Sequence, residues 1–257
     1  MAQIISIVNQ KGGVGKTTTA LNLGAALAQL GSRVLLVDLD PQANATSGLG
    51  VNWRELSAGV YEAITGTHSF RQVILSTGRD DYHLAPATQD LAGANVELVS
   101  LPNREMKLRE ALLEIRHDYD HILIDCPPSL GLLTVNGLTA ADHILIPVQA
   151  EYYALEGLGQ LLSTIELVRQ GLRPDLNILG AVLTMFDGRN KLSSDIMQEL
   201  YKFFPQKIFR SVVPRVVKLA EAPSFGKTIF EYDRNGKGAN AYDRLAREIL
   251  EQLDFKN

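Results

Sequence analysis

The sequence predicts a doubly wound α/β fold, in which a mostly parallel sheet carries helices on both faces. Short runs rich in Val, Ile and Leu recur along the 257 residues, and segments of helical periodicity lie between them. Strands that are apolar along their whole length are typical of a parallel sheet buried on both faces. Alternation of such strands with helices indicates a single domain, which we expect to span residues 1–257.

Six segments are predicted to be buried strands, because apolar residues fill them almost without interruption. They are residues 3–8, 33–38, 121–125, 143–148, 176–184 and 209–213. A weaker candidate covers residues 82–86, which we expect at an edge of the sheet.

Helical periodicity fills most of the remaining chain. Helices are predicted at residues 17–30, 89–98, 104–116, 130–140, 154–170, 191–203 and 239–254. Residues 41–81 are the least regular part and contain several Gly and Ser residues, so we expect a mobile excursion there.

Composition narrows the class of protein. A hydrophobic content of 46% and a charged content of 21% are ordinary for a soluble globular protein. No apolar run reaches the roughly 18 residues that a membrane-spanning helix needs. A single cysteine, Cys126, excludes an internal disulfide framework, and the first residues do not resemble a signal peptide. We therefore expect a cytoplasmic protein.

The stretch QKGGVGKTT, from Gln10 to Thr18, lies between the first predicted strand and the first predicted helix. Glycines let successive backbone N–H groups point at phosphate oxygens, and the helix start adds the positive end of its dipole. Lys16 is expected to reach the outer phosphates, and the Thr17 hydroxyl to bind Mg²⁺. The predicted nucleotide contacts in this loop are Lys11, Gly12, Gly13, Val14, Gly15, Lys16, Thr17 and Thr18.

Two features of this loop differ from the usual G-x-x-x-x-G-K-[ST] pattern. Gln10 stands where the first glycine belongs, and Lys11 adds a second lysine inside the loop. Lys11 cannot fold back onto the same phosphates as easily as Lys16, but it could reach the nucleotide of a neighbouring subunit. This arrangement predicts a homodimer that ATP holds together.

Three aspartates follow apolar strands at the edge of the sheet where the loop lies, which is where such sheets bind ligands. Asp125 is predicted to hold Mg²⁺ through one of its waters, and Asp38 to support those waters. Asp40, on a loop fixed by Pro41, is predicted to orient the water that attacks the γ-phosphate. The alternative is that each carboxylate only accepts hydrogen bonds from nearby backbone N–H groups.

The predicted base pocket favours adenine over guanine. A guanine-specific site would show Asn-Lys-x-Asp at the end of a late strand, whereas residues 184–187 read Thr-Met-Phe-Asp. We expect Met185 at this strand end, together with Pro214 and Val216, to lie around the base.

Charge is distributed unevenly along the chain. Residues 186–230 contain eight basic and four acidic residues, a net charge of +4, whereas the whole chain carries −4. Such asymmetry indicates contact with nucleic acid. The alternative is a solvated face of the domain.

Four ordered motifs resemble those of the ParA/MinD class of P-loop ATPases. Residues 11–18 resemble its deviant Walker A motif, residues 37–42 its switch I motif, and residues 122–131 its switch II motif. Residues 213–224, VPRVVKLAEAPS, resemble the chromosomal ParA (Soj) branch, although Val216 stands where that pattern has Asn. The resemblance covers nearly the whole chain.

This resemblance implies a weak, Mg²⁺-dependent, partner-stimulated ATPase that drives chromosome or plasmid segregation. In this family ATP closes a sandwich dimer through the signature lysine, here Lys11. Together with Lys16 and Asp40, Lys11 completes the predicted catalytic residues. The dimer binds double-stranded DNA without sequence preference, and the positions matching DNA contacts are Arg189 and Lys218. A ParB-like partner stimulates hydrolysis and releases the DNA, which implies a cytoplasmic protein associated with the nucleoid.

Three other classes of the same fold are alternatives. A MinD-like membrane ATPase needs a basic amphipathic C-terminal helix, whereas residues 241–257 are mixed in charge and predict a packed surface helix. An iron–sulfur protein needs several cysteines, and a related tyrosine kinase needs a tyrosine-rich tail. Cys126 and Tyr242 stand alone, and no membrane contact is expected.

Overall fold

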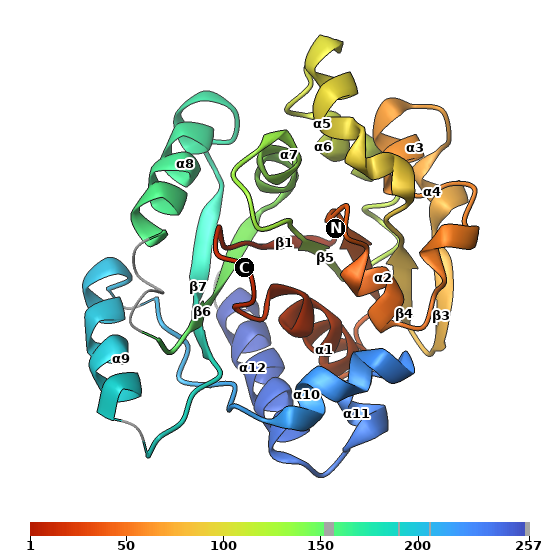
Figure 1. Ribbon diagram of the computed structural model, residues 1–257. Helices are drawn as coiled ribbons and strands as arrows, with labels where there is room; N and C mark the ends of the chain where they lie inside the picture. The colour runs from red at the N-terminus through yellow and green to blue at the C-terminus, as the bar shows by residue number, and fades with distance from the viewer. Residues whose placement is uncertain (152–156, 190, 206, 255–257) are drawn as a thin grey trace.

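The computed structural model describes residues 1–151, 157–189, 191–205 and 207–254, apart from the side chains of residues 95, 191–195 and 197. A seven-stranded sheet forms its centre, in the order β3-β4-β2-β5-β1-β6-β7 (Figure 1). The strands are β1 (Gln3–Ile7), β2 (Val34–Asp38), β3 (Leu75–Arg79), β4 (Tyr82–Ala85), β5 (His121–Asp125), β6 (His143–Gln149) and β7 (Asn177–Thr184). All neighbours pair in parallel except β3 and β4, so the predicted mostly parallel sheet is confirmed.

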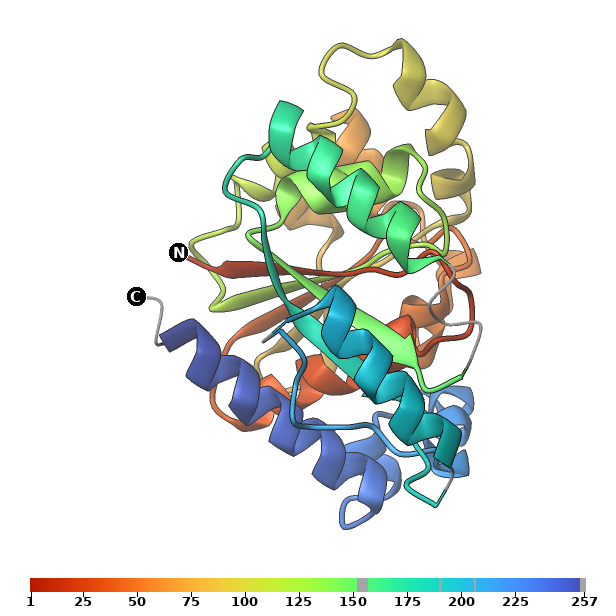
Figure 2. The same ribbon diagram turned by 90° about the vertical axis from the view of Figure 1, so that its left-hand side faces the viewer.

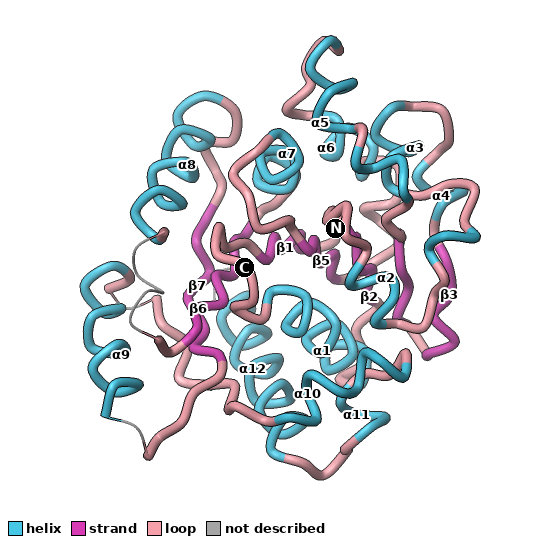
Figure 3. The backbone as a smooth tube through the Cα atoms, viewed as in Figure 1, coloured by secondary structure: helices cyan, strands magenta, loops and turns pink. Residues whose placement is uncertain are grey.

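Helices surround this sheet, as the cyan segments of Figure 3 show. They are α1 (Lys16–Gln29), α2 (Asn44–Gly48), α3 (Val60–Thr65), α4 (Phe70–Val73), α5 (Ala94–Glu97), α6 (Lys107–Leu112), α7 (Leu132–Ala140), α8 (Leu158–Gly171), α9 (Lys191–Phe203), α10 (Val217–Glu221), α11 (Ile229–Tyr232) and α12 (Lys237–Asp254). Short 3₁₀ turns are η1 (Trp53–Glu55), η2 (Gln89–Ala92), η3 (Leu98–Ser100) and η5 (Ala222–Phe225).

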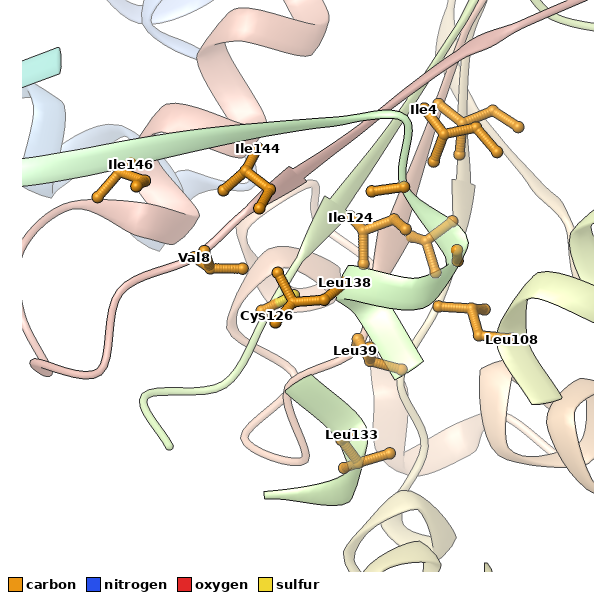
Figure 4. Packing of buried hydrophobic residues seen from close by; sticks show 14 of the residues in the cluster. Ile4, Val8, Leu39, Leu108, Ile124, Cys126, Leu133, Leu138, Ile144 and Ile146 are labelled. Carbon is orange, nitrogen blue, oxygen red and sulfur yellow. The ribbon is translucent and has the colours of Figure 1, made fainter. Parts of the chain in front are cut away.

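Two hydrophobic clusters cover the two faces of the sheet. Ile4 and Ile122 belong to the cluster shared with α7 and α8, part of which Figure 4 shows. Ile5 and Leu123, the next residues along the same strands, belong to the cluster shared with α1 and α12 on the opposite side (Figure 1). Because successive side chains of a strand point to opposite faces, burial of both faces explains why these strands are apolar throughout.

The strand predicted at residues 209–213 is wrong. This segment runs beside β7 but makes only isolated bridges, at Ile208 and Pro214. Between them the backbone N–H groups of Arg210 and Ser211 donate to the carboxylate of Glu248 on α12, at 2.8 and 2.9 Å. Phe209 and Val213 still donate their backbone N–H groups to Ala181 and Leu183 of β7. The carboxylate from a distant helix therefore takes the Ser211 donor, which a continuous strand would also direct to β7.

Several other boundaries differ from the expectations. Residues 82–86 do contain a strand, β4, but the edge of the sheet is β3, which lies in the segment expected to be irregular. That segment also holds α2, α3 and α4. The helix expected at 89–98 divides into η2, α5 and η3, and the helix expected at 104–116 is confined to α6. Residues 154–156 of the helix expected at 154–170 lie outside the described residues.

The C-terminal helix α12 packs against α1 at the bottom of Figure 1, and Figure 2 shows the same helix along the lower side. Its apolar residues Tyr242, Leu245 and Ile249 are fully buried. The predicted packed surface helix is therefore confirmed as far as Asp254, and residues 255–257 lie outside the described residues. Within the described part of the chain, no helix is long and apolar enough to cross a membrane.

Candidate nucleotide-binding site

The loop between β1 and α1 adopts the curled backbone that its glycines predict. Gly13 and Gly15 have φ angles of 75° and 87°, a region that residues with a Cβ rarely enter. The helix α1 begins directly after them, at Lys16. The hydroxyl of Thr184, at the end of β7, donates to the carbonyl of Val14 at 2.7 Å and so attaches the loop to the sheet.

Lys16 points back across the loop that precedes it. Its ammonium donates to the carbonyl of Lys11 at 3.1 Å, and the residue is only 6% exposed. Burial lowers the pKa of Lys16, while Asp125 and Asp40 oppose this shift. The charge of Lys16 is therefore held in a site that an additional anion would stabilise.

Two adjoining cavities lie along the loop. The first, of about 340 Å³, is lined by Gly12, Gly13, Gly15, Lys16, Thr17, Thr18, Leu21, Asp40, Asn44, Pro128, Met185 and Pro223. The second, of about 390 Å³, is lined by Gly15, Thr18, Thr184, Met185, Val213, Pro214, Arg215, Val216, Val217, Leu219, Ala220 and Tyr242. Their shared residues, Gly15, Thr18 and Met185, make the two cavities neighbours.

The two cavities differ in chemistry as the two ends of a nucleotide do. The first collects the loop, a lysine and a carboxylate, which suits phosphates. The second is mostly apolar and includes all three residues expected around the base, Met185, Pro214 and Val216. Met185 has a φ of 51°, so it turns the chain sharply where β7 ends and the two cavities meet.

Asp125 ends β5, and the sheet register places it opposite both Ile7 of β1 and Asp38 of β2. It is fully buried, and neither of its carboxylate oxygens has a hydrogen-bond partner among the described residues. Burial and then the charge of Asp38 raise the pKa of Asp125 well above its usual value. The nearby Thr17 side chain and the positive charge of Lys16 lower this pKa, but by less. An unpartnered buried carboxylate is costly, so this position calls for a positive ligand.

Asp38 is also fully buried, but its carboxylate has hydrogen-bond partners. Its two oxygens accept hydrogen bonds from the backbone of Asp40 and from Thr46. Burial raises the pKa of Asp38 to about 6, although the hydrogen bonds from Thr46 oppose the shift. Asp38 and Asp125 therefore have the same position in their strands but different surroundings.

Asp40 lies just beyond the end of β2 and lines the first cavity. One of its carboxylate oxygens accepts the backbone N–H of Gln42 at 3.0 Å. The other accepts no hydrogen bond from the part of the chain that the structure describes. Asp40 thus offers one oxygen acceptor toward the cavity that the loop between β1 and α1 lines.

The donor set fits Mg²⁺ that is bound together with phosphate. The described residues contain no group of three or more His, Cys, Asp or Glu side chains that could hold a metal by itself. Mg²⁺ in phosphate sites usually takes one or two protein ligands and fills its other positions with water and phosphate oxygens. The unpartnered carboxylate of Asp125 and the hydroxyl of Thr17, which lines the first cavity, match that need.

The two residues expected to contact DNA are exposed but already paired. Arg189 binds Asp187 through two hydrogen bonds of 2.9 and 2.8 Å, and its side chain is 91% exposed. Lys218, on α10, pairs with Asp233 at 3.0 Å. The charge count along residues 186–230 could not show this, because Asp233 lies outside that segment. The side chain of Lys191, in the same segment, lies outside the described residues.

Thr184, Tyr242 and Asn44 also line the two cavities, although the sequence patterns did not predict them there. Thr184 precedes Met185 at the strand end, so the rule that ligands bind at carboxyl ends of strands could have found it. Tyr242 comes from α12, and its hydroxyl lies 3.2 Å from that of Thr19. No local pattern marks it, because only the packing of α12 on α1 brings it there.

Comparisons with known proteins agree with this geometry. A family model described as an AAA domain matches residues 2–178. The sporulation initiation inhibitor protein Soj of Bacillus subtilis is 52% identical over 249 residues, covering 97% of this chain and 98% of that protein. The chromosome-partitioning ATPase Soj of Thermus thermophilus is 53% identical, with coverage of 97% and 96%.

The chain belongs to the ParA/Soj family of chromosome-partitioning ATPases. This confirms the resemblance that the four motifs carry. The chain is also similar to the chromosome partitioning protein ParA of Myxococcus xanthus, at 51% identity over 98% of this chain and 89% of that protein.

Solved structures share the fold of this family member. The cobyrinic acid a,c-diamide synthase of Mycobacterium smegmatis with bound ADP and magnesium has a TM-score of 0.89 at 38% identity, and the match covers 100% of this chain and 97% of that one. The ATP complex of McdA(D38A) from Cyanothece has a TM-score of 0.88 at 24% identity, covering 98% and 96%. Because its identity is only 24%, the likeness to McdA shows only that the fold is shared.

Proposed function

We propose that this partitioning ATPase binds ATP with Mg²⁺ in the two adjoining cavities, forms a dimer when ATP is bound, and then binds DNA without sequence preference. A ParB-like partner stimulates its weak hydrolysis, and the cycle drives segregation of a chromosome or plasmid. One observation carries the proposal: the phosphate loop, Asp40 and the apolar cavity around Met185, Pro214 and Val216 meet at one edge of the sheet.

In this proposal the loop backbone and Lys16 bind the phosphates, and the apolar cavity holds the adenine. Thr17 and Asp125 hold Mg²⁺, with Asp38 fixing the surroundings, and the ion neutralises charge on the phosphates. Binding of Mg²⁺ and ATP would supply the positive partner that the buried Asp125 carboxylate lacks within the described chain.

Hydrolysis then depends mainly on Asp40. Phosphoryl transfer asks the protein for positioning and charge stabilisation more than for covalent chemistry. The free oxygen of Asp40 accepts a hydrogen bond from the attacking water and orients it toward the γ-phosphate. The turn that carries Asp40 is fixed by its own hydrogen bond to Gln42, so the acceptor has little freedom to move.

The dimer depends on Lys11. Its backbone N–H donates to the Asn9 side chain at 3.0 Å, which fixes the start of the loop. Its ammonium has no acidic partner within 4 Å among the described residues, so it is available to the nucleotide of a second subunit. Lys11 contributes to catalysis by neutralising phosphate charge across the dimer.

The DNA contacts adjoin the nucleotide site. Lys218 lies in α10, and its neighbours Val216, Val217 and Leu219 line the apolar cavity. A nucleotide in this cavity touches the segment that carries Lys218. Because ADP carries the same adenine, the dependence of DNA affinity on ATP comes from the dimer, in which both subunits contribute these basic residues. Arg189 and Lys218 bind DNA phosphates once the phosphates displace their acidic partners.

Asp40→Ala tests the catalytic part of the proposal. The variant should bind ATP with wild-type affinity and dimerise, but its turnover should fall at least about 100-fold, because only the orientation of water is lost. Calorimetry measures affinity, light scattering measures dimerisation, and release of phosphate measures turnover. Wild-type turnover in this variant would assign the orientation of water to another group.

A further inference from the structure

The hydrogen bonds of Asp38 lead from the end of β2 into the helix α2. Its Oδ1 accepts the backbone N–H of Asp40 at 3.2 Å. Its Oδ2 accepts both the backbone N–H and the hydroxyl of Thr46, at 2.8 and 2.7 Å. Asp38 and Thr46 are both fully buried, so water does not compete for these bonds. The Thr46 contacts therefore fix the orientation of the carboxylate that holds Asp40.

The hydroxyl of Thr46 has a second role in the same network. It accepts the backbone N–H of Ala87, just after β4, at 3.0 Å. One hydroxyl thus connects the ends of β2 and β4 to α2. Because both its donor and its acceptor capacity are used, Thr46 cannot turn without breaking a buried hydrogen bond.

Between Asp40 and Thr46 the chain makes a tight turn. The carbonyl of Asp40 accepts the N–H of Ala43 at 2.9 Å, and Ala43 has a φ of 52°. A residue with a Cβ rarely adopts this conformation unless the surrounding structure imposes it. Here Asp38 holds both ends of the turn, at Asp40 and at Thr46.

We propose that Thr46 is a positioning residue for hydrolysis. Its hydroxyl orients Asp38, Asp38 holds the backbone of Asp40, and Asp40 is thereby kept in line with the γ-phosphate. The inference rests on the proposed role of Asp40. Thr46 lines neither cavity, so its effect should fall on turnover and not on ATP binding.

Thr46→Val tests this inference, because valine keeps the shape and the backbone N–H but removes the hydroxyl. We expect kcat to fall 10- to 100-fold while KM and the ATP affinity stay within twofold of wild type. Thr46→Ser restores the hydroxyl and should recover kcat to within threefold. If the valine variant does not fold, Thr46→Ala removes the same group without adding bulk, and ATP affinity reports whether the site is intact.

Thr139→Val is the matched control. Thr139 is another fully buried threonine, and its hydroxyl donates to the carbonyls of Glu105 and Asn136, on the side of the molecule that carries α7. The kcat of Thr139→Val should stay within threefold of wild type.

Three results would overturn the inference: a kcat within threefold of wild type in the variants that lack the Thr46 hydroxyl, no recovery in Thr46→Ser, or an equal loss in Thr139→Val. Asp40→Ala measured in parallel separates the two proposals. If Asp40→Ala turns over normally, the proposed function fails. If it is inactive while Thr46→Val is active, only the role of Thr46 fails.

Discussion

Asp125→Asn should change stability and activity in opposite directions. Asparagine has nearly the shape of aspartate but carries no charge. In the absence of nucleotide it removes a fully buried carboxylate whose oxygens have no hydrogen-bond partner among the described residues. The variant should therefore be more stable than the wild type without ligand, and much less active with Mg²⁺ and ATP.

The size of the change in unfolding free energy follows from the burial of the Asp125 carboxylate. An unsatisfied buried polar group costs about 1–3 kcal/mol, and more when it is charged. The asparagine amide is itself a buried polar group, so the gain in unfolding free energy should be about 1–2 kcal/mol. For a chain of this size that is a rise in Tm of about 2–8 °C.

The stability gained by Asp125→Asn should depend on pH. A carboxyl whose pKa is raised in the folded state stabilises the fold below its unfolded pKa, and this contribution is lost as pH rises through the folded pKa. The pKa of Asp125 is raised by burial and by Asp38. The wild type should therefore lose stability relative to Asp125→Asn as the pH rises above the ordinary aspartate pKa of 3.8. The difference in Tm should be smallest at low pH and should grow as the pH rises.

Asp142→Asn is the matched control, because its carboxylate is fully partnered. It accepts the N–H of Ile4 at 3.0 Å and pairs with Arg116 and Arg173 at 2.6 and 2.8 Å. Loss of these charge-assisted contacts should lower the unfolding free energy by about 1.5–3 kcal/mol.

Thermal melts with and without Mg²⁺ and ATP compare the Tm of the wild type with those of Asp125→Asn and Asp142→Asn. At 100 times Kd, a ligand stabilises the folded state by about 2.7 kcal/mol. Mg²⁺ should add stability in the presence of ATP for the wild type but not for Asp125→Asn, so their order reverses. A variant less stable than the wild type at pH 8 without nucleotide would show that the buried Asp125 carboxylate does not destabilise the free protein.

The remaining predictions concern phosphate and DNA. Lys16→Ala should abolish ATP binding in calorimetry, since it removes the strongest single contact to the outer phosphates; affinity near wild type would contradict the phosphate-loop assignment. Arg189→Glu and Lys218→Glu should each weaken DNA binding at least about 10-fold in retardation assays while dimerisation with ATP persists. Asp187→Asn and Asp233→Asn remove the competing carboxylates and should strengthen DNA binding, whereas unchanged binding in all four variants would mean that this face does not contact DNA.

The fold could be predicted because its signals are local and strong. Continuous apolar runs identify strands buried on both faces, and the ends of β1, β2 and β5 lie at one edge of the sheet, as their aspartates and the loop predict. The prediction failed at residues 209–213, where the apolar pattern fits a strand. There Glu248, from a helix near the other end of the chain, binds the backbone of Arg210 and Ser211.

The candidate site could be predicted as far as its motifs extend. Lys16, Asp40 and Met185 lie at the cavities as expected, because each stands directly after a strand or in the loop. Thr46 and Tyr242 could not be found in this way. Their places depend on the packing of α2 against β2 and of α12 against α1, and no spacing within the sequence encodes those contacts.

The ion-pair partners of the basic residues could not be predicted from the sequence either. The basic excess of residues 186–230 is real, but Lys218 and Arg215 pair with Asp233 and Glu151, which lie outside that segment. A count along the chain cannot report charge that is neutralised across space.

DNA binding in defined nucleotide states tests whether ATP controls the affinity of this protein for DNA. Retardation of several unrelated duplexes is measured with ATP, with a non-hydrolysable ATP analogue and with ADP, across a series of salt concentrations. We predict binding with ATP and the analogue, little binding with ADP, equal affinity for unrelated sequences, and a steep loss of affinity with salt, because phosphate contacts release counterions. Equal binding with ATP and ADP, or an affinity that salt does not change, would contradict this prediction.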